Sequence, residues 1–207
     1  MVSLDDFSVG QTPRMNRRVY WIVNGITLYR IVAAVAMVLM IVWSRWGVFK
    51  WLLPVSFLTD ALDGYLARRY RVVSVAGSAL DSIGDDLTVL VALIGLFIYV
   101  PGFFRKEIIP VMILGALYLT QTVAALVRYR KLSSFHTYLA KIAAISQGVF
   151  LILTFFLPSV PTVLFWVAVI LTGLDLAEEI IMVFLLPAWQ PDVKGLFTIL
   201  NGGHDKT

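Results

Sequence analysis

Carboxylates gather in one short part of this chain. Five of its 13 acidic residues fall between residues 60 and 86, in or beside apolar sequence. Asp60 and Asp63 are three residues apart and Asp81 and Asp85 four apart, so each pair shares a helix face. Unpaired carboxylates at membrane depth repel one another and lose hydration, which a hard divalent cation relieves. The spacing therefore predicts a site for Mg²⁺, Mn²⁺ or Ca²⁺, with room for two ions where carboxylates bridge.

Small residues continue both faces. Gly64 and Ala67 follow the first acidic pair, and Gly77 precedes Asp81 by four residues. They leave space for a bulky group beside the helix backbones, and Arg68 is placed to meet an anion. Cations, an arginine and a groove of small residues together suggest a pyrophosphate substrate. The alternative is a structural salt-bridge cluster or an ion pathway, which does not explain the small residues.

The complete pattern is similar to a known signature. Asp60-x2-Asp63-Gly64-x2-Ala67-Arg68-x8-Gly77-x3-Asp81-x3-Asp85 resembles that of the CDP-alcohol phosphotransferase (CDP-alcohol phosphatidyltransferase) family at all eight positions. We call these eight the signature residues. An earlier segment also resembles the opening of the family's first span: Asn24-Gly25-Ile26-Thr27 with Arg30.

The resemblance implies six transmembrane helices, a homodimer and an enzyme that transfers substituted phosphate groups. Such enzymes cleave a CDP-alcohol, release CMP and form a new phosphodiester with an acceptor alcohol. By position, Asp60, Asp63 and Asp81 match metal ligands, and Asp85 matches the general base, which also lies near the metal. The positions that match CDP-binding residues are Asp60, Gly64, Ala67, Arg68 and Gly77. Mg²⁺ or Mn²⁺, as two ions, is the expected cofactor.

The expected function is phospholipid biosynthesis. A phosphatidyl-type group passes from a CDP-lipid, with CDP-diacylglycerol the expected donor, to the hydroxyl of a polar acceptor. Two alternatives stay open: a soluble CDP-alcohol that donates its headgroup to diacylglycerol, and a divalent-cation transporter that uses the same carboxylates. The acids cluster near one face only, whereas transporters commonly show repeated broken helices across the bilayer.

Two sets of residues bear on the acceptor, and they point to different chemistry. Basic groups near the ends of the fourth and fifth apolar stretches suit a phosphorylated acceptor such as glycerol 3-phosphate or inositol phosphate: Arg128, Arg130, Lys131, His136 and Lys141. Acids on one face of the last stretch suit a polyol, serine, ethanolamine or choline-like acceptor, or instead pair with Arg30 or Arg68: Asp175, Glu178 and Glu179. Asp86 lies outside the signature stripe and is expected to face a basic group or the membrane interface.

The amino-acid composition indicates the kind of fold that positions these groups. Of the 207 residues, 59% are hydrophobic and 14% charged, too apolar for a soluble domain of this size. A cytosolic enzyme, a disordered chain and a nucleic-acid-binding domain are excluded. The absence of cysteine excludes disulfides, zinc–thiolate sites and thiol nucleophiles. We therefore predict an all-α polytopic membrane protein with six apolar spans: 24–44, 50–68, 80–100, 108–128, 138–157 and 161–187.

Basic residues predict the orientation. Twelve of the 17 lie at one set of span ends and four at the opposite ends, so both termini and the signature are expected on the cytoplasmic side of the cell inner or plasma membrane. Residues 1–23 form an N-terminal segment, 24–187 the catalytic domain and 188–207 a cytoplasmic tail. Residues 13–23 suit either a short amphipathic helix at the interface or a basic flank that only fixes topology.

Overall fold

The fold is all-helical over the residues that the computed structural model describes, which are 17–70, 75–130, 137–187, 193, 195, 196 and 199. Within these ranges, the structure describes the side chains of all residues except 17–28, 30, 60–61, 63–70 and 75–83. The helices in chain order are α1 (Arg17–Val42), α2 (Trp46–Tyr70), α3 (Val75–Tyr99), α4 (Pro101–Lys106), α5 (Ile108–Tyr129), α6 (Tyr138–Phe156) and α7 (Thr162–Leu185).

The six long helices coincide with the six predicted apolar stretches to within a few residues at most ends. The short α4 lies in the connection between the third and fourth predicted stretches. It begins with Pro101 at its first position, where a fixed φ and a missing N–H suit a helix start. Near the N-terminus, residues 17–23 form the first turns of α1 rather than a separate helix.

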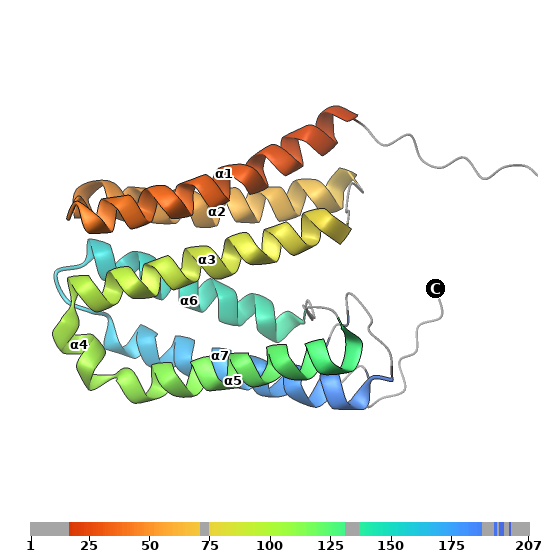
Figure 1. Ribbon diagram of the computed structural model, residues 1–207. Helices are drawn as coiled ribbons and strands as arrows, with labels where there is room; N and C mark the ends of the chain where they lie inside the picture. The colour runs from red at the N-terminus through yellow and green to blue at the C-terminus, as the bar shows by residue number, and fades with distance from the viewer. Residues whose placement is uncertain are drawn as a thin grey trace, which may run out of the picture.

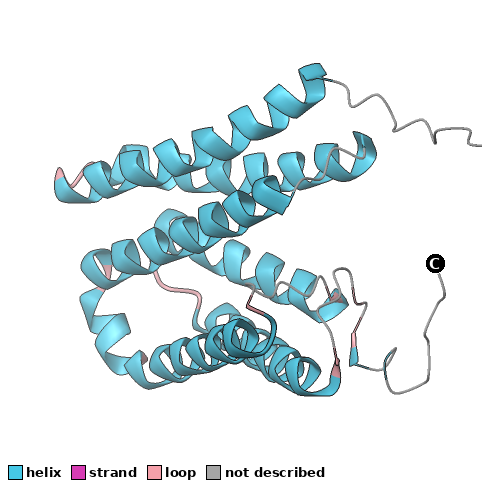
Figure 2. Ribbon diagram, turned by 45° about the vertical axis from the view of Figure 1, so that its right-hand side comes forward, coloured by secondary structure: helices cyan, strands magenta, loops and turns pink. Residues whose placement is uncertain are grey.

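The helices form two groups joined through α6 (Figures 1 and 2). The helices α1, α2 and α3 pack together, and α7 packs on both α5 and α6. Contacts of α6 with α2 and α3 join the groups. Figure 1 shows α4 at one end of the bundle. The last turns of α2, α5 and α7 and the first turns of α3 and α6 lie at the other end, so the signature and the candidate acceptor residues share that end.

Two of the described helices are long and apolar enough to cross a membrane: α5, with a mean hydropathy of 1.8, and α6, with 1.9. The helix α7 is 24 residues long and also apolar, but it carries three carboxylates. Large apolar side chains remain exposed along the outside of the bundle, among them Met112, Val127 and Val163. Such a surface is expected for helices that lipid surrounds. Six spans and cytoplasmic termini stay predictions.

Aromatic packing fills the centre of the bundle near the α4 end. Phe49 of α2 is fully buried, and its ring meets that of Phe155 of α6 edge-on, with centroids 4.8 Å apart. Trp46 and Tyr99 join the same group. A second, smaller cluster lies near the signature end, where Val193, Leu196 and Ile199 pack on buried side chains of α5 and α7. The chain after α7 therefore returns onto the bundle.

Candidate active site

The signature lies on two consecutive helices that pack against each other. Asp60, Asp63, Gly64, Ala67 and Arg68 occupy the last three turns of α2, and Gly77, Asp81 and Asp85 occupy the first three turns of α3. Only four residues, 71–74, separate the two helices, so the helices run antiparallel. This topology places all eight positions at one end of the bundle (Figure 1).

Two contacts define how α2 and α3 are aligned. The hydroxyl oxygens of Ser56 and Thr88 lie 3.2 Å apart, and both side chains are buried. Seven residues away on each helix, the ring of Phe49 covers Gly95, where a Cβ atom would meet Phe49 Cζ at 2.9 Å. The same alignment, continued seven residues in the other direction, brings Asp63 level with Asp81.

The remaining signature positions fall at matching levels too. Asp60 follows Ser56 by four residues, and Asp85 precedes Thr88 by three. Ala67 and Gly77 each lie eleven residues from the Ser56–Thr88 pair. The carboxylate positions of both helices therefore share about two turns of the bundle, with Ala67 and Gly77 one turn nearer the helix ends.

This arrangement fits a divalent cation by its donor set and by its alignment. All four acidic positions offer carboxylate oxygens, the ligands that Mg²⁺ and Mn²⁺ prefer. The Asp85 side chain is partly buried, while the side chains of Asp60, Asp63 and Asp81 lie outside the described part. Among the described side chains, no group of three or more metal-ligating residues is assembled. Arg68 also lies outside the described side chains.

Asp86 lies outside the signature stripe, and its described partner is a tyrosine. The side chain is exposed and accepts a hydrogen bond of 2.7 Å from the Tyr118 hydroxyl on α5. The described parts of α3 and α5 do not pack directly on each other. This side-chain bond therefore connects two helices that the backbone leaves apart.

The candidate acceptor residues on α5 and α6 have different surroundings. Arg128 donates through Nη2 and Nε to the Leu186 carbonyl at the end of α7, at 3.1 and 3.3 Å. Lys141 is exposed on α6, with its Nζ 5.3 Å from the Tyr138 ring centroid. Arg128 thus holds the ends of α5 and α7 together, whereas Lys141 is available to a ligand. Lys131 and His136 lie outside the described residues.

Asp175 and Glu178 of α7 accept hydrogen bonds from other parts of the chain. Glu178 Oε1 accepts the backbone N–H of Leu196 at 2.7 Å, and Asp175 Oδ1 accepts a long bond, 3.5 Å, from the Thr137 hydroxyl. Glu179 is buried, with 9% of its surface exposed. The same Thr137 caps α6 by accepting the Ala140 N–H. The predicted pairing with Arg30 or Arg68 falls on side chains outside the described part.

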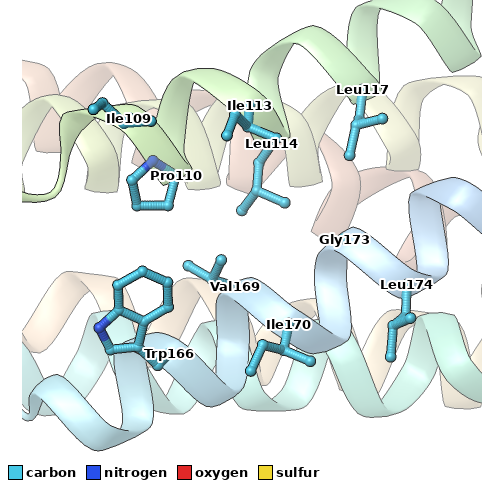
Figure 3. Close-up of a pocket in the computed structure, with 10 residues that line it drawn as sticks. All are labelled: Ile109, Pro110, Ile113, Leu114, Leu117, Trp166, Val169, Ile170, Gly173 and Leu174. Atoms are coloured by element: carbon cyan, nitrogen blue, oxygen red, sulfur yellow. The ribbon is translucent and has the colours of Figure 1, made fainter.

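Two surface grooves run between α5 and α7, and Asp85, the one signature residue whose side chain is described, lines neither of them. The first, of about 460 Å³, has an almost entirely hydrocarbon lining, from Pro110 and Trp166 at one end to Leu117 and Leu174 at the other (Figure 3). The second, of about 670 Å³, is nearer the signature end and includes Thr120 and Arg128. The residues described along the first groove offer no groups for phosphate or hydroxyl chemistry.

Comparison with known proteins assigns this chain to a family. Residues 20–174 match the CDP-alcohol phosphatidyltransferase family. The chain belongs to that family. The match includes all eight signature positions, and this is a membrane-associated family of transferases in phospholipid biosynthesis.

A curated member of the family gives a narrower comparison. The chain is 38% identical over 66 residues to a CDP-diacylglycerol–inositol 3-phosphatidyltransferase of Saccharomyces cerevisiae. That match covers 32% of this chain and 30% of the yeast protein. No solved structure matches the chain described here.

Sequence reasoning missed the polar residues that support the site. Ser56, Thr88 and Thr137 are buried hydroxyls, and Tyr118 links α3 to α5. A signal for the first two exists in the sequence: each lies within four residues of a signature aspartate, on the same helix stripe. Tyr118 and Thr137 have no such signal, because their partners are distant in the chain.

Proposed function

We propose that this protein transfers a phosphatidyl-type group from CDP-diacylglycerol to the hydroxyl of a polar alcohol and releases CMP in a metal-dependent reaction. The observation that carries the proposal is the alignment of α2 and α3, which brings the acidic positions of a complete family signature to matching levels. The family match over residues 20–174 supports the same reaction class.

Asp60, Asp63, Asp81 and Asp85 would hold two Mg²⁺ or Mn²⁺ ions. Bound there, the ions would neutralise negative charge on the pyrophosphate and on departing CMP. Arg68 would contact a phosphate oxygen. The absence of side-chain bulk at Gly64, Ala67 and Gly77 leaves room for the CDP group against the helices.

Direct attack by the acceptor is the simplest route, because the chain has no cysteine to serve as a thiol nucleophile. The acceptor oxygen bonds to the β-phosphorus as the bond to the CMP oxygen breaks, and CMP leaves with that electron pair. Asp85 takes the proton of the acceptor hydroxyl, as a carboxylate among other acids is suited to do. The active site is expected at the cytoplasmic face of a homodimer.

Inositol is the first acceptor to test, since the yeast relative's name specifies it. A polyol also suits the α7 carboxylates, whose oxygens can accept hydrogen bonds from hydroxyl groups. The exposed Lys141 and the remaining donors of Arg128 favour the second candidate, a phosphorylated alcohol, because both supply cations. Lys131, His136 and Glu178 complete the proposed acceptor pocket.

The test measures CMP release by purified protein in mixed micelles of detergent and CDP-diacylglycerol, with Mg²⁺ or Mn²⁺. Inositol, inositol phosphate, glycerol 3-phosphate, serine and ethanolamine are supplied separately. Asp85→Asn should abolish turnover while CDP-diacylglycerol binding persists, whereas the adjacent control Asp86→Asn should retain activity. Robust turnover by Asp85→Asn removes that residue as the base.

Two outcomes would replace the proposal. CMP release only from a soluble CDP-alcohol with diacylglycerol would reverse the donor and acceptor classes. No CMP with any acceptor, together with Mn²⁺ uptake into vesicles that carry the protein, would indicate a cation transporter.

A further inference from the structure

We propose that the buried hydroxyl pair of Ser56 and Thr88 sets the register between α2 and α3 and so positions the carboxylates of the metal site. These two are positioning residues, not ligands. The inference deepens the proposed function and rests on it for the identity of the site, but its test measures metal binding directly.

The pair is built as a specific interhelical bond. Each side chain is 1% exposed, and the two oxygens are 3.2 Å apart. Thr88 Oγ1 also donates to the Gly84 carbonyl of its own helix at 2.9 Å. That bond uses the single hydroxyl proton of Thr88, so Ser56 donates and Thr88 accepts. Both hydroxyls are thereby satisfied in an apolar surrounding, where an unpaired one is costly.

The position of the pair along the helices is what connects it to the site. On α2, Ser56 precedes Asp60 by one turn and Asp63 by two. On α3, Thr88 follows Asp85 by about one turn and Asp81 by two. The pair therefore extends both signature stripes toward the centre of the bundle. A shift of α2 along α3 at the pair would displace the carboxylates of the two helices relative to each other by the same distance.

Packing beyond the pair follows the same register. Phe49 covers Gly95 one heptad away from the hydroxyls, and the close approach needs the missing side chain. Apolar packing alone specifies register weakly, whereas a single buried polar pair can satisfy its bonds in one alignment only. A slip of one turn moves one helix by about 5.4 Å, more than twice the metal–oxygen distance of about 2.0–2.2 Å.

The test measures Mn²⁺ binding to the full-length protein in detergent by electron paramagnetic resonance of the free ion. Ser56→Ala and Thr88→Val should each weaken Mn²⁺ binding about tenfold, the scale found when a residue that orients a metal ligand is lost. The double variant should bind no more weakly than the weaker single variant, because the two substitutions break one bond. Ser56→Thr keeps a hydroxyl and should restore binding.

Thr154→Val is the matched control. Thr154 is equally buried, at 2% exposed, but its hydroxyl donates only to Phe150 of its own helix, so Mn²⁺ affinity should stay within about twofold of the wild type. If Thr88→Val and Thr154→Val lower the thermal midpoint equally, but only Thr88→Val weakens Mn²⁺ binding, the loss of binding reflects positioning and not a general loss of stability.

The inference is overturned if folded Ser56→Ala and Thr88→Val bind Mn²⁺ as the wild type does, or if the wild type binds no Mn²⁺. In the first case CMP release by the wild type would still support the proposed function. Conversely, Mn²⁺ binding that depends on the pair, without CMP release from any donor, would support the pair and refute the transferase.

Discussion

Substitution of Gly95 by alanine tests the close approach of α2 and α3. Gly95 is buried on α3, and a Cβ atom there would lie 2.9 Å from Phe49 Cζ and 3.4 Å from Phe155 Cζ. A ring could normally rotate away from such a contact. Here the Phe49 ring is fully buried and packs edge-on against both Trp46 and Phe155, so relief requires the helices themselves to separate.

The magnitude follows from two opposing effects. Overpacking of a filled core by one methyl group costs about 1–3 kcal/mol. Replacing glycine by alanine within a helix contributes about 0.5–1 kcal/mol in the other direction. Gly115, in the middle of α5, supplies the second effect alone, because nothing lies within 4 Å of a Cβ built there. The difference between the two variants therefore isolates the steric cost of about 1–3 kcal/mol.

The assay is thermal unfolding in detergent, followed by circular dichroism. For a chain of this size, about 1–3 kcal/mol corresponds to a midpoint about 2–12 °C lower for Gly95→Ala than for Gly115→Ala. Phe49→Leu removes the ring atoms that the new methyl group meets, so Gly95→Ala should cost much less in that background. If Gly95→Ala and Gly115→Ala have the same midpoint, or if Phe49→Leu leaves the cost unchanged, the proposed tight approach of α2 and α3 is wrong.

Three further predictions concern the polar contacts around the site. Tyr118→Phe removes the donor to Asp86 and should lower the free energy of unfolding by about 1 kcal/mol; an unchanged thermal midpoint would mean that water replaces the bond without cost. Thr137→Ala removes the cap of α6 and should cost about 1 kcal/mol, while Thr137→Ser should not; faster amide exchange at the start of α6 in the alanine variant alone is the measurement. Gly195→Ala should release the chain after α7 and increase its cleavage in limited proteolysis, because Gly195 has φ +148° and a Cβ there would lie 3.2 Å from Glu178 Oε1. Equal cleavage rates would contradict this.

The helical framework could be predicted from the sequence because long apolar stretches are a strong signal. Each of the six predicted stretches coincides with a long helix. The signature was equally accessible, since i, i+3 and i, i+4 spacing places residues on one face wherever a helix forms. The family match over residues 20–174 confirms the family resemblance.

Contacts between distant residues could not be predicted in the same way. Asp86 was expected to meet a basic group or the interface, but its described partner is Tyr118, 32 residues away. Nothing near Asp86 in the sequence indicates which face of α5 comes near it. The bond of Glu178 with the Leu196 N–H likewise depends on the chain turning back after α7, which no periodic pattern encodes.

Two of the candidate acceptor residues also have structural roles. The sequence offered Arg128 and Glu178 as ligand-binding groups of opposite charge. In the structure Arg128 donates to the Leu186 carbonyl and Glu178 accepts from Leu196, so each already stabilises the end of α7 and the chain that follows it. Substitution of either residue will therefore alter stability as well as any acceptor affinity.

Lys141 gives the cleaner discrimination between acceptor classes, because it is exposed and, among the described residues, its side chain approaches only the Tyr138 ring. If the acceptor carries a phosphate, Lys141→Gln removes a full charge from its recognition and should raise KM for glycerol 3-phosphate or inositol phosphate about tenfold or more, with little change in kcat. If the acceptor is a neutral polyol such as inositol, the same variant should leave KM within about twofold, since a glutamine still donates hydrogen bonds. Equal KM changes for charged and neutral acceptors would exclude Lys141 from acceptor recognition, because a loss of charge acts selectively on an anion.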